Sequence, residues 1–263
     1  MLKRRQKIEL RTPGEIDAMA ATGGVVAAVL AACSEACVPG ATPQDLDGVA
    51  DRVMTEGGAV TVYRGYHPAW APGPYPAVLC VSVNDVIVHA IPDDRELGPG
   101  DLVSIDFACS LDGWCADAAV TVSVGEPTPG DAALMAATRA CLEAGIAAAQ
   151  PGATLGDVGA ALARPAQETR FGMLEDHGGH GIGRTMHAPP HVANFGVPGQ
   201  GLDLRPGLVI ALEPMLQAGG RGDYRHLPDG WGVATADRSR AAHFEHTVAI
   251  TADGPRVLTV PAG

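Results

Sequence analysis

The sequence predicts an α+β fold, with helices on one side of a mostly antiparallel sheet. Three observations predict it: an internal repeat, two pairs of helix signals, and strand-like runs rich in Val, Ile and alternating apolar residues. Among the 263 residues are 34 Gly and 21 Pro, which indicates many turns and disfavours a helical bundle. Apolar residues make up 46% of the chain and charged residues 18%, so the chain can bury a core.

The internal repeat divides the chain into two related halves. Thr12-Pro13-Gly14-Glu15 recurs as Thr128-Pro129-Gly130-Asp131, and Pro39-Gly40-Ala41-Thr42 recurs as Pro151-Gly152-Ala153-Thr154. The order of the two blocks is the same in both copies, although the spacing between them changes. We therefore expect two homologous halves, about 12–125 and 128–260, within a single domain over 1–263 that has an N-terminal tail at 1–11.

Each half begins with signals for a pair of helices. Thr12 is a helix N-cap, Pro13 occupies the first helical position, and Glu15 completes a capping box. A helix to about Glu35 follows, and a second helix runs from about Thr42 to Thr55 after a Pro-Gly turn. The repeat predicts the corresponding helices of the second half near 130–149 and 154–168.

Strand-like runs follow each helical pair. They are 78–83, 86–90, 102–110 and 114–124 in the first half, and 208–213, 231–236, 243–251 and 256–260 in the second. Two such halves related by pseudo-symmetry leave a cleft between them, which is a favoured place for a binding site.

Charge and cysteine content narrow the class of protein. With 18 basic and 30 acidic residues the net charge is -12, which argues against DNA binding because phosphate contacts need clustered positive charge. The six cysteines form no Cys-x-x-Cys pair, so we expect buried, reduced thiols in a cytoplasmic protein. The uncharged run 18–34 is shorter than the roughly 20 residues of a membrane span, and no membrane segment is expected.

Two aspartates interrupt the apolar strands of the first half. Asp106 lies within 102–110 and Asp117 within 114–124, and Asp112-Gly113 between them is a strong hairpin signal. A two-residue loop there pairs Asp106 with Ala119 and places Asp117 on the same face, diagonal to Asp106. Solvated acids are common near hairpins, but two acids on one face of apolar strands favour a shared cation.

Three residues of the second half show a similar pattern. Glu213 ends the apolar run 208–213 and Glu245 lies within 243–251, and burying a lone glutamate is costly. His180 lies in the glycine-rich segment 177–183, where the backbone can approach a ligand closely. His177-x-x-His180 alone is a weak zinc signal. Four carboxylates and one imidazole suit two divalent first-row metal ions, which together form a hydrolytic site.

The chain resembles a known family, the type I methionine aminopeptidases, over nearly its whole length. That family has the pita-bread (creatinase/aminopeptidase-like) fold, two pseudo-symmetric halves around a dinuclear metal cleft. The blocks that carry the resemblance are Val88-His89-Ala-Ile-Pro-Asp93, Val103-Ser-Ile-Asp106, Asp112-Gly-Trp-Cys-Ala-Asp117, Gly179-His180-Gly-Ile-Gly-Arg184, Ile210-Ala-Leu-Glu213-Pro-Met215, Asp229-Gly-Trp231 and Phe244-Glu245-His246-Thr247. The five metal ligands that the resemblance implies are Asp106, Asp117, His180, Glu213 and Glu245.

The resemblance implies a metal-dependent methionyl aminopeptidase that removes the initiator methionine from nascent proteins and peptides with a small second residue. Its cofactors would be two divalent ions, chosen from Co, Mn, Fe and Zn. Glu213 would move the proton, His187 would stabilise the tetrahedral oxyanion, and His89 would contact the peptide nitrogen. The methionine side chain would contact Tyr66, Cys80, Met186 and Trp231, a soft and aromatic lining that suits a thioether.

The chain departs from the family pattern in a few places. Ala118-Ala119 follow Asp117 where Thr-Ser is usual, so a supporting hydroxyl is missing. Met186 stands where an aromatic residue often precedes the histidine, and a Pro-rich loop at 68–76 borders the pocket. These departures affect substrate range and metal affinity and leave the reaction class intact.

Other functions remain as alternatives. They are a proline-specific aminopeptidase, a monometallic or structural zinc protein, and a catalytically weak pita-bread paralogue that acts as a binding protein or prefers a different N-terminal residue. The expected partners are nascent polypeptide N-termini, and the family precedent is a monomer. The basic cluster Lys3-Arg4-Arg5-Lys7 suggests transient contact with the ribosome.

Overall fold

Four helices in the described part of the chain each begin with a threonine N-cap. The computed structural model describes residues 8–174 and 176–261. The helices are α1 (Pro13–Ala36), α2 (Pro43–Glu56), α3 (Pro129–Ala148) and α4 (Leu155–Gln167). Their N-caps are Thr12, Thr42, Thr128 and Thr154, which are the threonines of the sequence repeat. The predicted helices are confirmed, and the same local capping chemistry starts each of them.

The strands lie mainly in one antiparallel sheet. They are β1 (Val60–Thr61), β2 (Cys80–Val83), β3 (Val86–Val88), β4 (Leu102–Leu111), β5 (Trp114–Ser123), β6 (Gly172–Met173), β7 (Gly178–Gly181), β8 (Ala188–Ala193), β9 (Val209–Leu212), β10 (Met215–Gln217), β11 (Tyr224–His226), β12 (Val233–Thr235), β13 (Ala241–His243), β14 (Glu245–Thr251) and β15 (Gly254–Val257). The main sheet has the order β1-β4-β5-β14-β9-β7-β8, with β15 paired to β14 and β2 paired to β4. Two smaller sheets have the orders β13-β10-β6 and β11-β12-β3.

The hairpin of β4 and β5 has the predicted register. Asp106 pairs with Ala119, and Asp117 pairs with Ala108. Asp112 and Gly113 both have positive φ, at 51° and 75°, as a tight two-residue loop between twisted strands requires. The long hairpin therefore places two aspartates on one face of the sheet.

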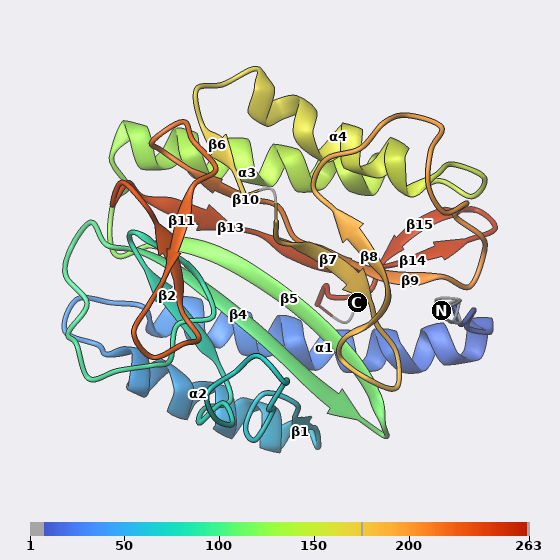
Figure 1. The fold of residues 1–263 in the computed structure, drawn as a ribbon. Coiled ribbons are helices and arrows are strands. Elements are labelled where there is room, and N and C mark those ends of the chain that lie inside the picture. The colour runs from blue at the N-terminus through green and yellow to red at the C-terminus, as the bar shows by residue number, and fades with distance from the viewer. Residues whose placement is uncertain (1–7, 175, 262–263) are drawn as a thin grey trace.

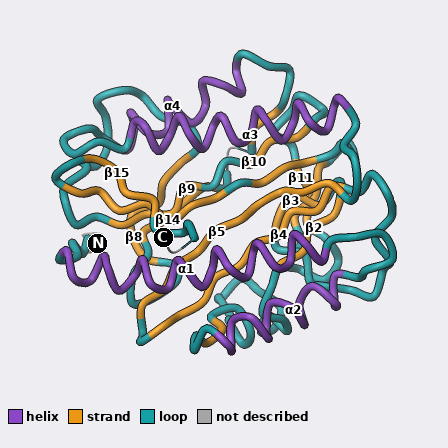
Figure 2. The backbone as a smooth tube through the Cα atoms, turned by 180° about the vertical axis from the view of Figure 1, so that it is seen from behind, coloured by secondary structure: helices purple, strands orange, loops and turns teal. Residues whose placement is uncertain are grey.

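The helices cover one side of the strands, and each pair packs over its own half. In Figure 1 α3 and α4 lie along the top and α1 passes behind β4 and β5; Figure 2, from behind, shows α1 in front of β5. Val26 of α1, Leu46 of α2 and Phe107 of β4 share one buried core. Leu162 of α4 and Ile210 of β9 share a second core. The mixed helix and antiparallel-sheet architecture is as predicted.

Helix α1 is long and apolar. By length and composition alone it could cross a membrane, and it is the one helix of this kind in the part of the chain that the structure describes. Val26, Val29 and Cys33 on this helix are fully buried in the protein core, as in the core helix of a globular domain.

Several short strands were not predicted. The run 243–251 is broken at Phe244 into β13 and β14, and β6, β7, β8, β10 and β11 follow no apolar alternation. The segments of β7 and β8, Gly178–Gly181 and Ala188–Ala193, are rich in Gly and Pro, which sequence patterns assign to loops. These two strands pair with each other, and β7 also pairs with β9 through Gly181 and Ile210, which ties them to the main sheet.

Candidate active site

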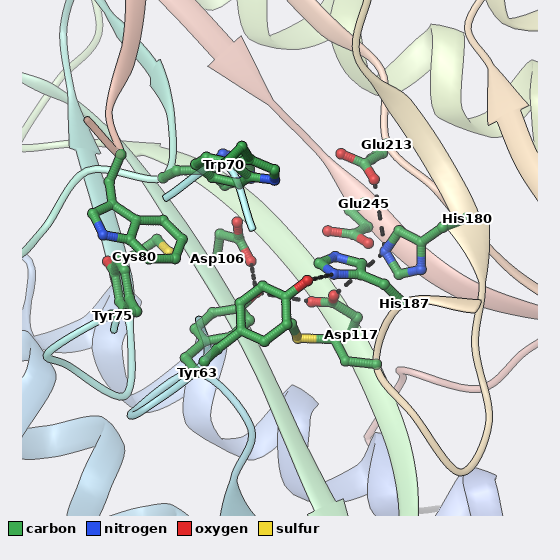
Figure 3. A pocket seen from close by; sticks show the side chains of 14 residues that line it. Tyr63, Trp70, Tyr75, Cys80, Asp106, Asp117, His180, His187, Glu213 and Glu245 are labelled. Carbon is green, nitrogen blue, oxygen red and sulfur yellow. Dashed lines mark hydrogen bonds and ion pairs between the residues drawn. The ribbon is translucent and has the colours of Figure 1, made fainter. Parts of the chain in front are cut away.

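The cleft of the molecule brings together residues from both halves of the chain. It encloses about 520 Å³, including open solvent at its mouth. Figure 3 shows Cys80, Tyr75 and Trp70 on one side of it, Glu213, Glu245 and His180 on the other with Asp117 below the glutamates, and Asp106 between the two sides. All five predicted metal ligands line this cleft, and so do all six predicted substrate contacts: Tyr66, Cys80, His89, Met186, His187 and Trp231.

Three neighbouring strands align two of the acids in one row. Asp106 of β4 lies opposite Ala119 of β5, and Ala119 lies opposite Glu245, the first residue of β14. Residues directly opposite each other in an antiparallel sheet point to the same face. The small side chain of Ala119 therefore leaves room for a carboxylate on each side of it, and Asp117 joins this face two residues along β5.

Glu213 approaches from the next strand of the sheet. It follows β9 directly and precedes Pro214, which turns the chain towards β10. The pairing of His246 with Leu212 places Glu213 beside Glu245 at the adjoining strand ends. Apolar strands carry both glutamates into the interior, and Glu245 is only 3% exposed.

Glycines allow the strand that carries His180 to reach the site. A Cβ atom on Gly179 would lie 1.9 Å from the carbonyl oxygen of Ala211, so only glycine permits this approach of β7 to β9. His180 Nε2 lies 3.8 Å from Asp117 Oδ2 and 3.8 Å from Glu213 Oε1. Its Nδ1 donates to the carbonyl oxygen of Gly181 at 3.0 Å. Because a carbonyl only accepts, the neutral imidazole presents its Nε2 lone pair to the carboxylates.

Burial dominates the electrostatics of the acids. It raises the pKa of Asp106 to about 6, and it raises the pKa of Asp117, with the charge of Asp106 adding to the effect. The pKa values of Glu213 and Glu245 are raised well above their usual range, first by burial and then by the charge of Asp117. Four carboxylates in one buried space repel each other when ionised, and a cation among them removes that penalty.

Burial also keeps the histidines of the cleft neutral. It lowers the pKa of His180 to about 3 and of His89 to about 4, and it lowers the pKa of His187. His187 Nδ1 is hydrogen-bonded to the Tyr66 hydroxyl at 2.9 Å. His89 has a φ of 62°, a left-handed conformation that is uncommon outside glycine and that aims its ring into the cleft.

Tyr63 is a site residue that the sequence reasoning missed. Its hydroxyl donates to Asp106 Oδ1 and lies 3.2 Å from Asp117 Oδ1, so it lies between the two carboxylates. The residue belongs to the loop between β1 and β2, and its sequence context does not differ from that of a core tyrosine. Only the fold shows that it lies at the acids.

The apolar end of the cleft contains more aromatic rings than predicted. The Trp231 ring lies 5.0 Å from Tyr75 and 5.1 Å from Trp70 between centroids, in edge-to-face arrangements. Trp70 belongs to the Pro-rich loop 68–76 and is 62% exposed, so it forms part of the rim. The loop therefore contributes to the pocket itself.

Comparison with known proteins assigns the chain to a family. Residues 17–252 match metallopeptidase family M24. The chain belongs to metallopeptidase family M24. It is 49% identical to methionine aminopeptidase 1 of Mycobacterium tuberculosis over 266 residues, which cover 98% of this chain and 97% of the relative. The predicted resemblance is thereby confirmed.

Solved structures of the M24 family have the same fold. The crystal structure of methionine aminopeptidase from Rickettsia prowazekii matches with a TM-score of 0.92 and 34% identity, covering 97% of this chain and 100% of that one. The prolidase of Pyrococcus furiosus matches with a TM-score of 0.73 at 20% identity, which shows the fold alone. The predicted pita-bread fold is confirmed.

The donor set fits the divalent metal that an M24 metallopeptidase requires. One ligand atom each from Asp117, His180 and Glu245 lie within 4.8 Å of one another. Glu245 Oε1 is buried without a hydrogen-bond partner in the described structure, which is costly unless a cation or water binds it. Oxygen-rich ligation with an imidazole nitrogen is typical of sites for first-row divalent ions.

Proposed function

We propose that the chain removes the N-terminal methionine from nascent proteins and peptides whose second residue is small. One observation carries this proposal: a single cleft has a cluster of metal donors at one end and a thioether-sized apolar lining at the other. The M24 relatives with the highest identity reported above are named methionine aminopeptidases, and this reaction accounts for both ends of the cleft.

Two divalent ions would be held by Asp106, Asp117, His180, Glu213 and Glu245. Bound there, they would supply Lewis-acid polarisation of the scissile carbonyl and lower the pKa of water. Their choice among Co, Mn, Fe and Zn follows availability, because all four suit this donor set. Because the donors come from both halves of the chain, residues 1–263 would act as a single catalytic domain.

Side chains of the cleft would transfer the proton and would position the peptide for attack. Glu213 faces His180 with one carboxylate oxygen, and it would accept the proton of the attacking water and deliver it to the leaving amine. The Tyr66 hydroxyl would donate to His187 Nδ1, which leaves the Nε2–H of His187 free to donate to the developing oxyanion. The neutral ring of His89 would contact the peptide nitrogen next to the cleaved bond.

The methionine side chain would occupy the apolar end of the cleft. Cys80 and Met186 offer polarisable sulfur, and the rings of Tyr66 and Trp231 offer edges and faces that a thioether contacts favourably. Trp70 and the Pro-rich loop would close the rim over this side chain.

The test is methionine release from Met-Ala-Ser and Met-Leu-Ser by metal-stripped protein titrated with Co²⁺ or Mn²⁺. We expect metal-dependent release from the alanine peptide and little from the leucine peptide. Glu245→Gln is the matched inactive variant, because it removes one donor oxygen and keeps the side-chain volume. Absence of release by folded, metal-titrated protein contradicts the proposal, and release of another N-terminal residue would favour a paralogue of different preference.

We also propose that the enzyme is a cytoplasmic monomer that contacts the ribosome transiently. The basic residues Lys3, Arg4, Arg5 and Lys7 support this contact by their charge, and they lie outside the residues that the structure describes. Deletion of residues 1–7 should abolish salt-sensitive co-sedimentation with ribosomes while peptide cleavage continues. Unchanged co-sedimentation would contradict the contact.

A further inference from the structure

His243 carries a buried imidazole beside the proposed metal site. It is not one of the five proposed ligands, and the proposed reaction does not use it. It is the last residue of β13, two positions before Glu245, and it is 1% exposed. Neither Nδ1 nor Nε2 has a hydrogen-bond partner in the described structure. Buried nitrogen atoms in proteins nearly always have a partner, so each of these two requires an explanation.

The geometry around His243 repeats the geometry around His180. His243 Nε2 lies 4.0 Å from Glu213 Oε2 and 3.9 Å from Glu245 Oε2. His180 Nε2 lies 3.8 Å from Glu213 Oε1 and 3.8 Å from an oxygen of Asp117. The two oxygens of Glu213 therefore face two different imidazoles, and each imidazole also faces one further acid.

The distances from His243 Nε2 to the two glutamate oxygens are too long for hydrogen bonds, but they match the distance between two atoms that bind the same metal ion. A hydrogen bond between nitrogen and oxygen needs about 2.7–3.2 Å. Two atoms that each bind a metal at about 2.0–2.2 Å lie roughly 3–4 Å apart, as the nitrogen and oxygen atoms do here. Glu213 and Glu245 lie beside each other where β9 pairs with β14 (Figure 3), and His243 Nε2 faces one oxygen of each.

We propose that His243 is a second imidazole donor of the metal site, on the side of Glu213 and Glu245. This inference rests on the proposed function for the presence of metal ions. Each imidazole then serves one pair of acids. His180 faces Asp117 and Glu213, and His243 faces Glu213 and Glu245. Because imidazole suits Zn²⁺ and carboxylate oxygen suits Mn²⁺, His243 shifts the selectivity of the site towards Zn²⁺.

The first test measures the affinities of metal-stripped protein for Zn²⁺ and Mn²⁺ by competition calorimetry. His243→Gln keeps a polar side chain and removes the imidazole. We expect about a 10–100-fold weaker affinity for Zn²⁺ and a much smaller change for Mn²⁺, so the Zn²⁺/Mn²⁺ affinity ratio falls about tenfold or more.

The matched control is His246→Gln on the adjoining strand. His246 is partly buried, and its Nδ1 is hydrogen-bonded to Thr259 Oγ1 at 2.8 Å, away from the carboxylates. This variant should lower the melting temperature and leave the affinity ratio unchanged. The Zn²⁺/Mn²⁺ affinity ratio therefore distinguishes a histidine that binds the metal from a histidine that only contributes to packing.

A second measurement needs no variant. X-ray absorption of the full chain loaded with two equivalents of Zn²⁺ counts the imidazoles bound per pair of ions. Two imidazoles support the inference, and one overturns it. An unchanged Zn²⁺/Mn²⁺ ratio in a folded His243→Gln protein overturns it as well. Failure of the unaltered protein to bind either metal would overturn the proposed function and this inference together.

Discussion

At the scale of single residues, hydroxyl groups from distant parts of the chain form hydrogen bonds with the two aspartates of the site. Ala118 and Ala119 lack the hydroxyl groups that the family pattern has after Asp117. In the structure the hydroxyl of Thr247 bonds the backbone of Asp117, accepting from its N–H at 3.0 Å and donating to its carbonyl at 2.8 Å. Tyr63 supports the carboxylate itself. Hydroxyl groups of Thr247 and Tyr63 therefore hold the backbone and the carboxylate of Asp117, and the small side chains of Ala118 and Ala119 leave space for the acids.

Tyr63→Phe tests this support. Without the hydroxyl, the carboxylates of Asp106 and Asp117 lose the donor that orients them, so we expect metal affinity to fall about 10–100-fold. Calorimetric titration with Mn²⁺ measures the change. Tyr75→Phe is the control, because its hydroxyl donates to the backbone carbonyls of Leu79 and Ala90 and to neither aspartate among the described residues. Equal metal affinities for the two variants would contradict the role given to Tyr63.

The six thiols give a second prediction at this scale. All six cysteines are buried and free, and burial raises the pKa of Cys33 and of Cys109 to about 12. Because the thiolate is the reactive form, the native protein should not react with a thiol reagent such as Ellman's within minutes at pH 8. Denaturation in guanidinium should expose all six. Rapid modification of native protein would mean that one of these thiols opens to solvent.

At the scale of elements, the close approach of strand β7 to strand β9 positions His180, the one imidazole among the five predicted ligands. Strand β7 meets β9 through a single residue pair, Gly181 with Ile210, and also pairs with β8. Glycines on both sides of His180 make this possible, since a Cβ atom on either would contact backbone oxygen atoms at about 2 Å or slightly more. The position of His180 is therefore set by its neighbours.

Gly179→Ala should displace β7. The new Cβ atom would lie 1.9 Å from the carbonyl oxygen of Ala211, and relieving that overlap should destabilise the protein by about 3 kcal/mol or more and abolish metal binding. Thermal unfolding with and without Mn²⁺ measures both effects. Gly48→Ala on α2 meets nothing within 4 Å and should be neutral or stabilise by up to about 1 kcal/mol. Similar melting temperatures for both variants would refute the argument.

At the scale of the whole molecule, the metal-free protein should lose stability as pH rises. The pKa of Asp106 is raised to about 6, and burial raises those of Asp117, Glu213 and Glu245 well above their usual range, so the folded state binds more protons than the unfolded state. The stabilisation is complete below the unfolded pKa values near 4 and is lost as pH rises through the folded ones.

We therefore expect the melting temperature of metal-stripped protein to fall by about 5 °C or more between pH 5 and pH 8. Addition of Mn²⁺ at pH 8 should restore it, because the cation binds the ionised carboxylates of the folded state only. Scanning calorimetry at each pH, with and without metal, measures both effects. A metal-free melting temperature that rises over this range would show that the carboxylates are not buried together.

Much of the architecture could be predicted because its signals are local. The threonine caps start α1 to α4, and Asp112-Gly113 fixes the register of β4 with β5 and the shared face of Asp106 and Asp117. The short strands β6, β7 and β8 could not be predicted, since their Gly and Pro residues carry no apolar period. The roles of the five ligands stay predictions, although the fold places them in one cleft.

The sequence by itself determined the helices, the long hairpin, the residues that carry carboxylates on apolar strands, and the family. Periodicity, caps and turn residues act over a few positions, so they are readable without the fold. The tertiary structure alone decided that Tyr63 lies between two aspartates, that Trp70 joins the pocket, and that His243 faces two glutamates. Those contacts join residues far apart in the chain, and only the packing of whole strands and loops brings such residues together.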